Sequence, residues 1–128
     1  MRLLLDTCTF LWIIKDDPAL SKKARSLFTK PDNEVFLSTI SFWEILIKNQ
    51  LGRLPLPKPA EQFIISQRKH HQIESLELDE ASVEQISFLP EYHYDPFDRM
   101  LICQAISNGL TILTPDKAIR QYPVSCMW

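Results

Sequence analysis

Short apolar segments alternate with segments of helical periodicity along most of this 128-residue chain. The apolar segments 3–5, 35–37, 73–76, 111–113 and 124–126 have the length of buried strands. Strands that alternate with helices are typical of an α/β domain with a mainly parallel central sheet, because parallel neighbours need a crossover connection. The chain length fits one domain, and we expect a single domain over residues 1–128.

The helices are expected between these strands, where apolar residues recur every three or four positions. One precedes a break at 16–18, and another starts near Ser21 and stops before Pro31. Further helices are predicted over 40–51, 60–70, 79–88, 96–108 and 116–120. In the 79–88 helix, Val83, Ile86 and Ser87 are expected to face inward.

The segment 94–105, YDPFDRMLICQA, combines a helix start with two aspartates. Asp95 is a good N-cap, and Pro96 suits the first helical turn because its missing N–H has no partner there. Asp98 lies one turn into the helix, where a negative charge complements the helix dipole. Capping explains the position of Asp95, whereas the carboxylate of Asp98 could also bind a ligand or take part in catalysis.

Four acids are expected at one edge of the sheet, where open parallel sheets bind their ligands. Asp6 ends the first strand and Asp116 follows the strand 111–113. Glu44 lies in the helix after the second strand, and Asp98 lies in the helix before 111–113. Clustered carboxylates repel each other and are tolerated mainly when a cation holds them together. Oxygen ligands of this kind suit Mg²⁺ or Mn²⁺. Such ions serve phosphodiester hydrolases, so the pattern favours a metal-dependent enzyme of that class.

Each acid also has a purely structural interpretation. Asp6 and Asp116 could cap the helices that follow them. Glu44 could complete a capping box with Ser41, or form an exposed ion pair with Lys48 one turn later. These interpretations are weaker for the four acids together than for any one of them.

Charge and cysteine content fit a cytoplasmic protein. The net charge of −2 does not indicate a nucleic-acid binder, but it becomes +3 when the acids Asp6, Glu44, Asp95, Asp98 and Asp116 are set aside. Three cysteines without CxxC spacing fit a reducing compartment, with Cys8 expected as a small buried filler and Cys103 and Cys126 as core. The apolar start is too short to span a membrane and has no signal cleavage site.

Two other classes of phosphoryl-transfer enzyme are each excluded by a single residue of the sequence. A haloacid-dehalogenase-like phosphatase needs a second aspartate two residues after Asp6, where Cys8 stands. A cysteine phosphatase needs an arginine six residues after Cys8, where the chain has Ile14.

The segments LLLDTCTFLW, STISFWEILIKNQLGRLPLP, DPFDRMLICQA and LTILTPD together resemble the PIN-domain ribonucleases. More narrowly, they resemble the VapC-type toxins of bacterial toxin–antitoxin pairs. The resemblance implies a PIN-like three-layer α/β/α domain and an endoribonuclease that uses Mg²⁺ or Mn²⁺. It also implies a cognate antitoxin, whose gene would be adjacent, and a homodimer. A PIN-like binding module without catalytic activity is the alternative.

By this resemblance, Asp6, Glu44, Asp98 and Asp116 are the catalytic and metal-binding acids. Thr7 and Thr114 are expected as supporting hydroxyls near them. Asp95 is expected to cap its helix, and Arg99 to pair with a carboxylate or to meet the phosphate. The position of Cys8 often holds histidine or another polar residue in similar proteins.

Basic and aromatic residues give weaker signals. Lys48, Arg53 and Lys58 could follow the phosphates of an RNA substrate. Trp12 and Trp43 stand at helical core spacing and are assigned to packing before base stacking. The remaining candidates, His70, His71 and His93, are expected on the surface or facing RNA.

Overall fold

A five-stranded sheet forms the centre of the computed structural model, which describes residues 1–92 and 95–128. The strands are β1 (Arg2–Leu5), β2 (Glu34–Ser38), β3 (Glu74–Leu76), β4 (Thr111–Leu113) and β5 (Cys126–Met127), in the order β3-β2-β1-β4-β5. Each neighbouring pair is parallel. The expected α/β class is therefore confirmed. His93 and Tyr94, named above, lie outside the described residues.

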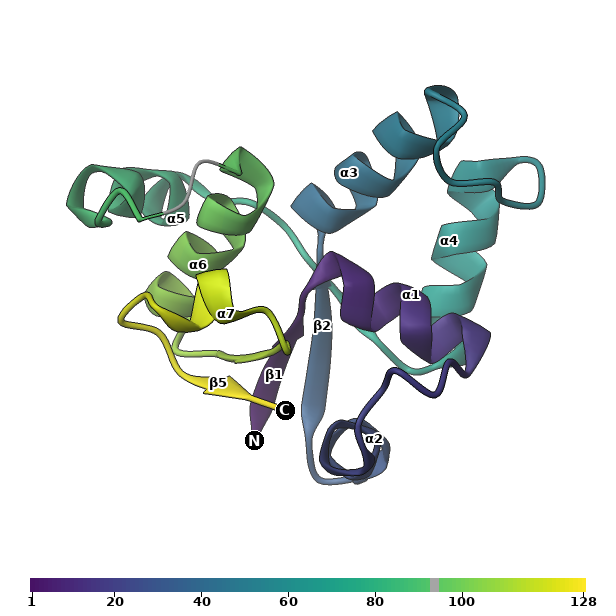
Figure 1. Cartoon of the computed structure of the whole chain (residues 1–128), viewed down its shortest axis with the longest axis horizontal. Coiled ribbons are helices and arrows are strands. Elements are labelled where there is room, and N and C mark those ends of the chain that lie inside the picture. Colours follow the sequence, from purple (N-terminus) through teal and green to yellow (C-terminus); the bar gives the residue numbers. More distant parts are fainter. Residues whose placement is uncertain (93–94) are drawn as a thin grey trace.

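Helices cover both faces of this sheet (Figure 1). They are α1 (Thr7–Lys15), α2 (Lys22–Thr29), α3 (Thr39–Gln50), α4 (Ala60–His70), α5 (Glu80–Glu84), the 3₁₀ helix η1 (Gln85–Phe88), α6 (Pro96–Asn108) and α7 (Lys117–Arg120). Gly109 ends α6 with a φ of 65°, a left-handed conformation that glycine adopts without strain.

Alternating side chains of the central strands build the two core layers. Leu3 and Leu5 of β1 belong to a buried cluster with Phe10 of α1 and Ile64 of α4. Leu4, between them, belongs to a second cluster with residues of α6 and α7. The sheet is thus buried on both faces, which explains why its strands are apolar runs rather than alternating patterns. This arrangement confirms the three-layer α/β/α prediction.

The strand order reverses between β1 and β4. From β1 the chain proceeds to β2 and β3 on one side, while β4 and β5 lie on the other side. Leu5 at the end of β1 is in register with Leu113 at the end of β4. The residues that follow these two strands therefore leave the sheet side by side, at the kind of edge where open α/β sheets bind ligands.

Two local predictions are wrong in part. The expected helix 79–88 is a short α5 followed by η1. Val83 (42% exposed) and Ser87 face outward, whereas Ile86 packs against the core as predicted. A 3₁₀ helix has about three residues per turn, so the α-helical spacing does not continue through this segment. The last strand, expected at 124–126, is β5 at Cys126–Met127.

Candidate active site

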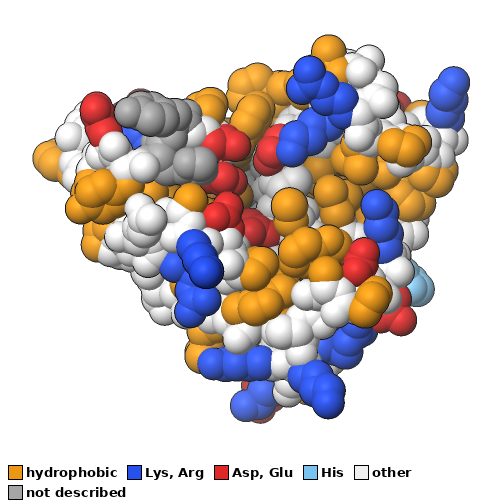
Figure 2. All heavy atoms as spheres, viewed as in Figure 1, with side chains coloured by type: hydrophobic (Ala, Val, Ile, Leu, Met, Phe, Trp, Pro, Cys, Tyr) orange, Lys and Arg blue, Asp and Glu red, His pale blue; other side chains and the backbone are white. Residues whose placement is uncertain are grey.

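The four acids singled out in the sequence line one pocket of about 140 Å³. Acidic side chains gather in the hollow at the centre of the face shown in Figure 2. The pocket is lined by Asp6, Thr7, Cys8, Glu44, Lys48, Asp95, Asp98 and Asp116. These residues come from α1, α3, the start of α6 and the start of α7, which converge at the carboxyl edge of the sheet.

Asp6 is held in the pocket by two protein donors. It is buried, and its Oδ1 accepts a hydrogen bond from the backbone N of Thr9 at 2.7 Å, which caps α1. Its Oδ2 accepts a hydrogen bond from the hydroxyl of Thr114, which follows β4. The same hydroxyl oxygen accepts from the backbone N of Asp116 at 3.0 Å. The strand register explains this contact, because β1 and β4 end next to each other.

Asp116 is also the N-cap of α7, accepting from the backbone N of Ala118 at 2.8 Å. The capping interpretation of Asp6 and of Asp116 is therefore right, and both residues line the pocket as well. Capping and pocket lining are compatible because a cap residue precedes its helix, and these helices begin at the edge of the sheet.

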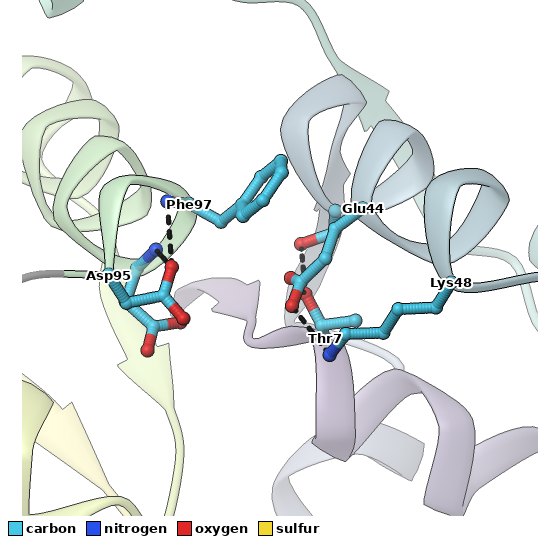
Figure 3. Close-up of polar contacts among 7 residues, drawn as sticks. Thr7, Glu44, Lys48, Asp95 and Phe97 are labelled. Atoms are coloured by element: carbon cyan, nitrogen blue, oxygen red, sulfur yellow. Dashed lines mark hydrogen bonds and ion pairs between the residues drawn. The ribbon is translucent and has the colours of Figure 1, made fainter. Parts of the chain in front are cut away.

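Glu44 is enclosed by α1 and by its own helix (Figure 3). Its side chain is 8% exposed, and its Oε1 accepts from the hydroxyl of Thr7 at 2.6 Å. That hydroxyl also lies 3.0 Å from Oγ of buried Ser41. Oε2 of Glu44 pairs with Nζ of Lys48 at 2.8 Å. The ion pair expected as an exposed alternative exists, but its acid is buried.

Asp95 and Asp98 face this group across the pocket from the first turn of α6. Oδ1 of Asp95 accepts from the backbone N of Phe97 at 2.9 Å and of Asp98 at 3.3 Å, so the predicted N-cap is confirmed (Figure 3). Within residues 1–92 and 95–128, Arg99 forms no ion pair, and its buried Nε has no hydrogen-bond partner.

Burial and charge shift the proton affinities in the pocket. Burial raises the pKa of Asp6 above its ordinary value, although hydrogen bonds from Thr114 and Thr9 oppose the shift. The hydrogen bond to Glu44 raises the pKa of Lys48, which keeps the ammonium charged. Burial, followed by the charge of Asp6, raises the pKa of the Cys8 thiol, so the thiolate is disfavoured.

The donor chemistry of the pocket fits a hard divalent cation, because five carboxylates line it. Across the described part of the chain, however, no three His, Cys, Asp or Glu side chains are grouped as they would be around a metal ion. Asp6 instead accepts a hydrogen bond from Thr114, and Glu44 pairs with Lys48. The carboxylate of Asp116 caps the N-terminus of α7.

Two sequence-based assignments of side chains near the pocket are wrong. Cys8 is exposed and lines the pocket rather than filling the core. Trp43 is 57% exposed, whereas Trp12 packs against the core as predicted. The alternative of a capping box between Ser41 and Glu44 is excluded, because α3 begins at Thr39 with Ser38 as its N-cap.

Ser41 lies beside the site through its contact with Thr7, a role that the sequence did not predict. Its only sequence signal is its spacing from Glu44, which was interpreted as a capping box. Of the proposed RNA contacts, Lys48 lines the pocket, while Arg53 and Lys58 are exposed outside its lining.

A second pocket lies beside the first and has the opposite character. It has a volume of about 370 Å³ and only apolar lining residues, from α3, α5, α6 and the segment before α5: Ile40, Trp43, Leu78, Val83, Pro96, Phe97 and Met100. The rings of Trp43 and Phe97 meet edge to face, with centroids 5.2 Å apart. Exposed apolar surface of this kind is typical of protein–protein contacts.

None of the helices in residues 1–92 and 95–128 combines the length and the apolar character needed to cross a membrane.

Comparison with known proteins places this geometry in a family. The chain is similar to Ribonuclease VapC16 of Mycobacterium tuberculosis, with 27% identity over 107 residues that cover 82% of this chain and 70% of the relative. Among solved structures it is similar to VapBC2 from Rickettsia felis bound to a DNA fragment from their promoter, with a TM-score of 0.74 and 17% identity over 100% of this chain and 99% of the other. It is also similar to DNA-bound VapBC from Salmonella typhimurium, with a TM-score of 0.68 and 19% identity over 99% of this chain and 97% of the other.

The structural likenesses show a shared fold, and the VapC relative supports the narrower resemblance found in the sequence. The model of the PIN domain family matches residues 3–124, which is nearly the whole chain. The chain therefore belongs to the PIN domain family.

Proposed function

We propose that this protein is an endoribonuclease that hydrolyses RNA phosphodiester bonds with the help of Mg²⁺ or Mn²⁺. The proposal rests on one observation: four acids converge on one pocket at the edge of the sheet where the strand order reverses. These acids are Asp6, Glu44, Asp98 and Asp116. The name of the VapC16 ribonuclease supports the same reaction class.

In this proposal the four acids are the residues that hold the cation. The chemistry that a bound divalent cation supplies is activation of a water molecule and stabilisation of the charged oxygens during phosphodiester displacement. Thr7 and Thr114 orient Glu44 and Asp6 through their hydroxyl groups. Such supporting hydrogen bonds fix the direction of a ligand and commonly affect affinity or activity by about 10- to 100-fold.

Cleavage of a labelled RNA by the wild type, Asp6→Asn and Asp98→Asn, with and without EDTA, tests this function. We expect loss of cleavage in both variants and in EDTA, with recovery of the wild type when Mg²⁺ or Mn²⁺ is added. Asn still accepts the capping hydrogen bond of α1, so Asp6→Asn removes charge without removing the cap. Asp32→Asn is the matched control, because Asp32 is exposed and lies outside the pocket.

Activity that survives both substitutions and EDTA would contradict the proposed mechanism. A wild type that cleaves neither RNA nor DNA with either metal would favour the alternative of a catalytically silent PIN-like binding module. DNA of the same sequence, included in each assay, tests the choice of RNA as substrate.

We further propose that the protein is the toxin of a toxin–antitoxin pair in the cytoplasm and that a small antitoxin inhibits it. The VapBC names of the structural neighbours support this proposal. Co-expression with the protein encoded by the adjacent gene should give a stable complex with suppressed RNA cleavage. Separate elution of the two proteins, with undiminished cleavage, would contradict it.

A homodimer is the third part of the proposal. The apolar pocket around Trp43 and Val83 supports it, since both residues are exposed in a single copy (57% and 42%). Light scattering on the isolated protein should give twice the chain mass of 15.0 kDa. A mass of one chain at micromolar concentration would contradict the dimer.

A further inference from the structure

Lys48 is the one basic residue among the described residues that line the acidic pocket. The five acids around it are Asp6, Glu44, Asp95, Asp98 and Asp116. Its Nζ lies 2.8 Å from Oε2 of Glu44, and its side chain is 46% exposed. The ammonium therefore reaches from the surface into the site (Figure 3).

The partner of this ammonium is a carboxylate that needs compensation. The Glu44 side chain is 8% exposed, and its other oxygen has one described donor, the hydroxyl of Thr7. A buried carboxylate without a counter-charge is strongly disfavoured, and neighbouring acids add repulsion. The ammonium of Lys48 supplies the positive charge from one helical turn away, at the spacing where side chains of a helix meet.

A divalent cation at Glu44 would provide the same compensation and would repel the ammonium. The two positive charges cannot share Oε2 at close range without mutual repulsion. Lys48 can leave this position easily, because its long side chain is half exposed and water can solvate the displaced ammonium.

We propose that Lys48 is a tethered counter-ion, which neutralises Glu44 when no divalent cation is bound and competes with such a cation for that carboxylate. The inference rests on the proposed function in one respect, namely that the acidic pocket takes a divalent cation. It assigns Lys48 a positioning role on Glu44, in place of the RNA-phosphate contact expected from the sequence.

Calorimetric titration of the full-length protein with Mn²⁺, in the absence of RNA, tests the competition. Lys48→Met removes the charge and keeps most of the side-chain length, and Lys48→Arg retains a charge. We expect Lys48→Met to bind Mn²⁺ at least ~3-fold more tightly than the wild type, the scale for removing one partly solvated like charge. Lys48→Arg should stay near the wild type, and so should the control Lys23→Met, whose lysine is exposed on α2.

Thermal unfolding in EDTA tests the counter-ion role without any metal. Lys48→Met should unfold at a lower temperature than the wild type and Lys23→Met, and saturating Mn²⁺ should remove most of the difference. Glu44→Gln combined with Lys48→Met should lose both the stability defect and the tighter binding, because the carboxylate that couples the two effects is absent.

Two results separate this inference from the proposed function. If Glu44→Gln weakens Mn²⁺ binding but Lys48→Met leaves it unchanged or weakens it, the counter-ion role is overturned and the metal site stands. If neither the wild type nor Lys48→Met binds Mn²⁺ or Mg²⁺, both proposals fail. A Lys48→Met protein with unchanged metal affinity and weaker RNA binding would return Lys48 to the phosphate-contact role.

Discussion

One pair of helices, α3 and α6, forms walls of two pockets with opposite chemistry. The acidic pocket takes Glu44 and Lys48 from α3 and Asp98 from α6. The apolar pocket takes Trp43 from α3 and Phe97 from α6. At one point in each helix, consecutive residues line different pockets, namely Trp43 and Glu44 in α3 and Phe97 and Asp98 in α6.

The geometry of an α-helix explains this division. Consecutive residues point about 100° apart around the axis, so neighbours can line different surfaces. The Trp43–Phe97 ring contact joins the helices on the apolar side, while Glu44 and Asp98 lie on the acidic side. A partner bound at the apolar pocket would therefore contact the same two helices that carry Glu44 and Asp98.

The largest expected effect is on the acidic side, at Asp98. Asp98→Asn should reduce RNA cleavage by at least ~100-fold, because it removes a charged candidate ligand while amide and carboxylate have similar size. The matched variant is Asp95→Asn, three residues earlier, whose amide can still cap α6 and which should lose far less activity. Initial rates at saturating Mg²⁺ measure both. Equal losses in the two variants would remove the distinction between capping acid and catalytic acid.

A smaller effect is expected on the apolar side, at Trp43. Trp43→Ser should raise the dimer dissociation constant by about 10-fold or more, since a large exposed aromatic residue is the type that dominates protein contacts. Sedimentation equilibrium over a range of concentrations measures it. Leu51→Ser is the control, because Leu51 is 60% exposed just beyond α3 and outside the pocket.

The ring of Trp43 also packs on Phe97, so the melting temperature should be recorded for each variant. Unchanged dissociation in Trp43→Ser with a lowered melting temperature would mean that the apolar pocket serves the fold rather than association.

The next expected effect concerns Thr7, which lines the acidic pocket from the first turn of α1. Thr7→Val keeps the shape of the side chain and removes the hydroxyl that donates to Oε1 of Glu44. We expect about 10-fold slower cleavage, and a loss of about 1–3 kcal/mol in the free energy of unfolding from the missing donor to a buried acid. Thr29→Val, on the exposed end of α2, is the control. Slower cleavage with unchanged stability would indicate that Thr7 contacts the substrate instead.

Much of this architecture is predictable from the sequence. The bounds predicted for α4, α6 and β4 match the structure at both ends. For α6 the reason is local, because Asp95, Pro96 and Gly109 are strong start and stop signals. The convergence of the acids followed from the parallel sheet, since all its strands end at one edge.

The wrong predictions for Cys8 and Trp43 share a physical cause. Whether Cys8 or Trp43 faces the core depends on how α1 and α3 are rotated against their neighbours, and helical spacing alone leaves that rotation open. Trp43 belongs to an apolar face that lies toward α5 rather than the main core. The burial of Glu44 has the same origin, because Thr7 and Ser41 enclose it through contacts between α1 and α3.

The smallest expected effect lies outside both pockets, at His71 after α4. Burial, followed by the charge of His70, lowers the pKa of His71 below its ordinary value of 6.5. The unfolded chain therefore binds a proton at this residue more readily than the folded chain does. The stability contributed by neutral His71 is complete above the unfolded pKa and is lost as the pH falls through the folded pKa.

Melting temperatures of the wild type and His71→Gln, compared between about pH 7.5 and 5.5, isolate this contribution. The wild type should lose more stability than the variant over this range, while His70→Gln should behave more like the wild type, since burial is the larger cause of the shift. Other groups that titrate in both proteins cancel in the difference. RNA cleavage by His71→Gln should match the wild type at pH 7.5, because His71 lines neither pocket. Slower cleavage at that pH would extend the functional surface beyond α3 and α6.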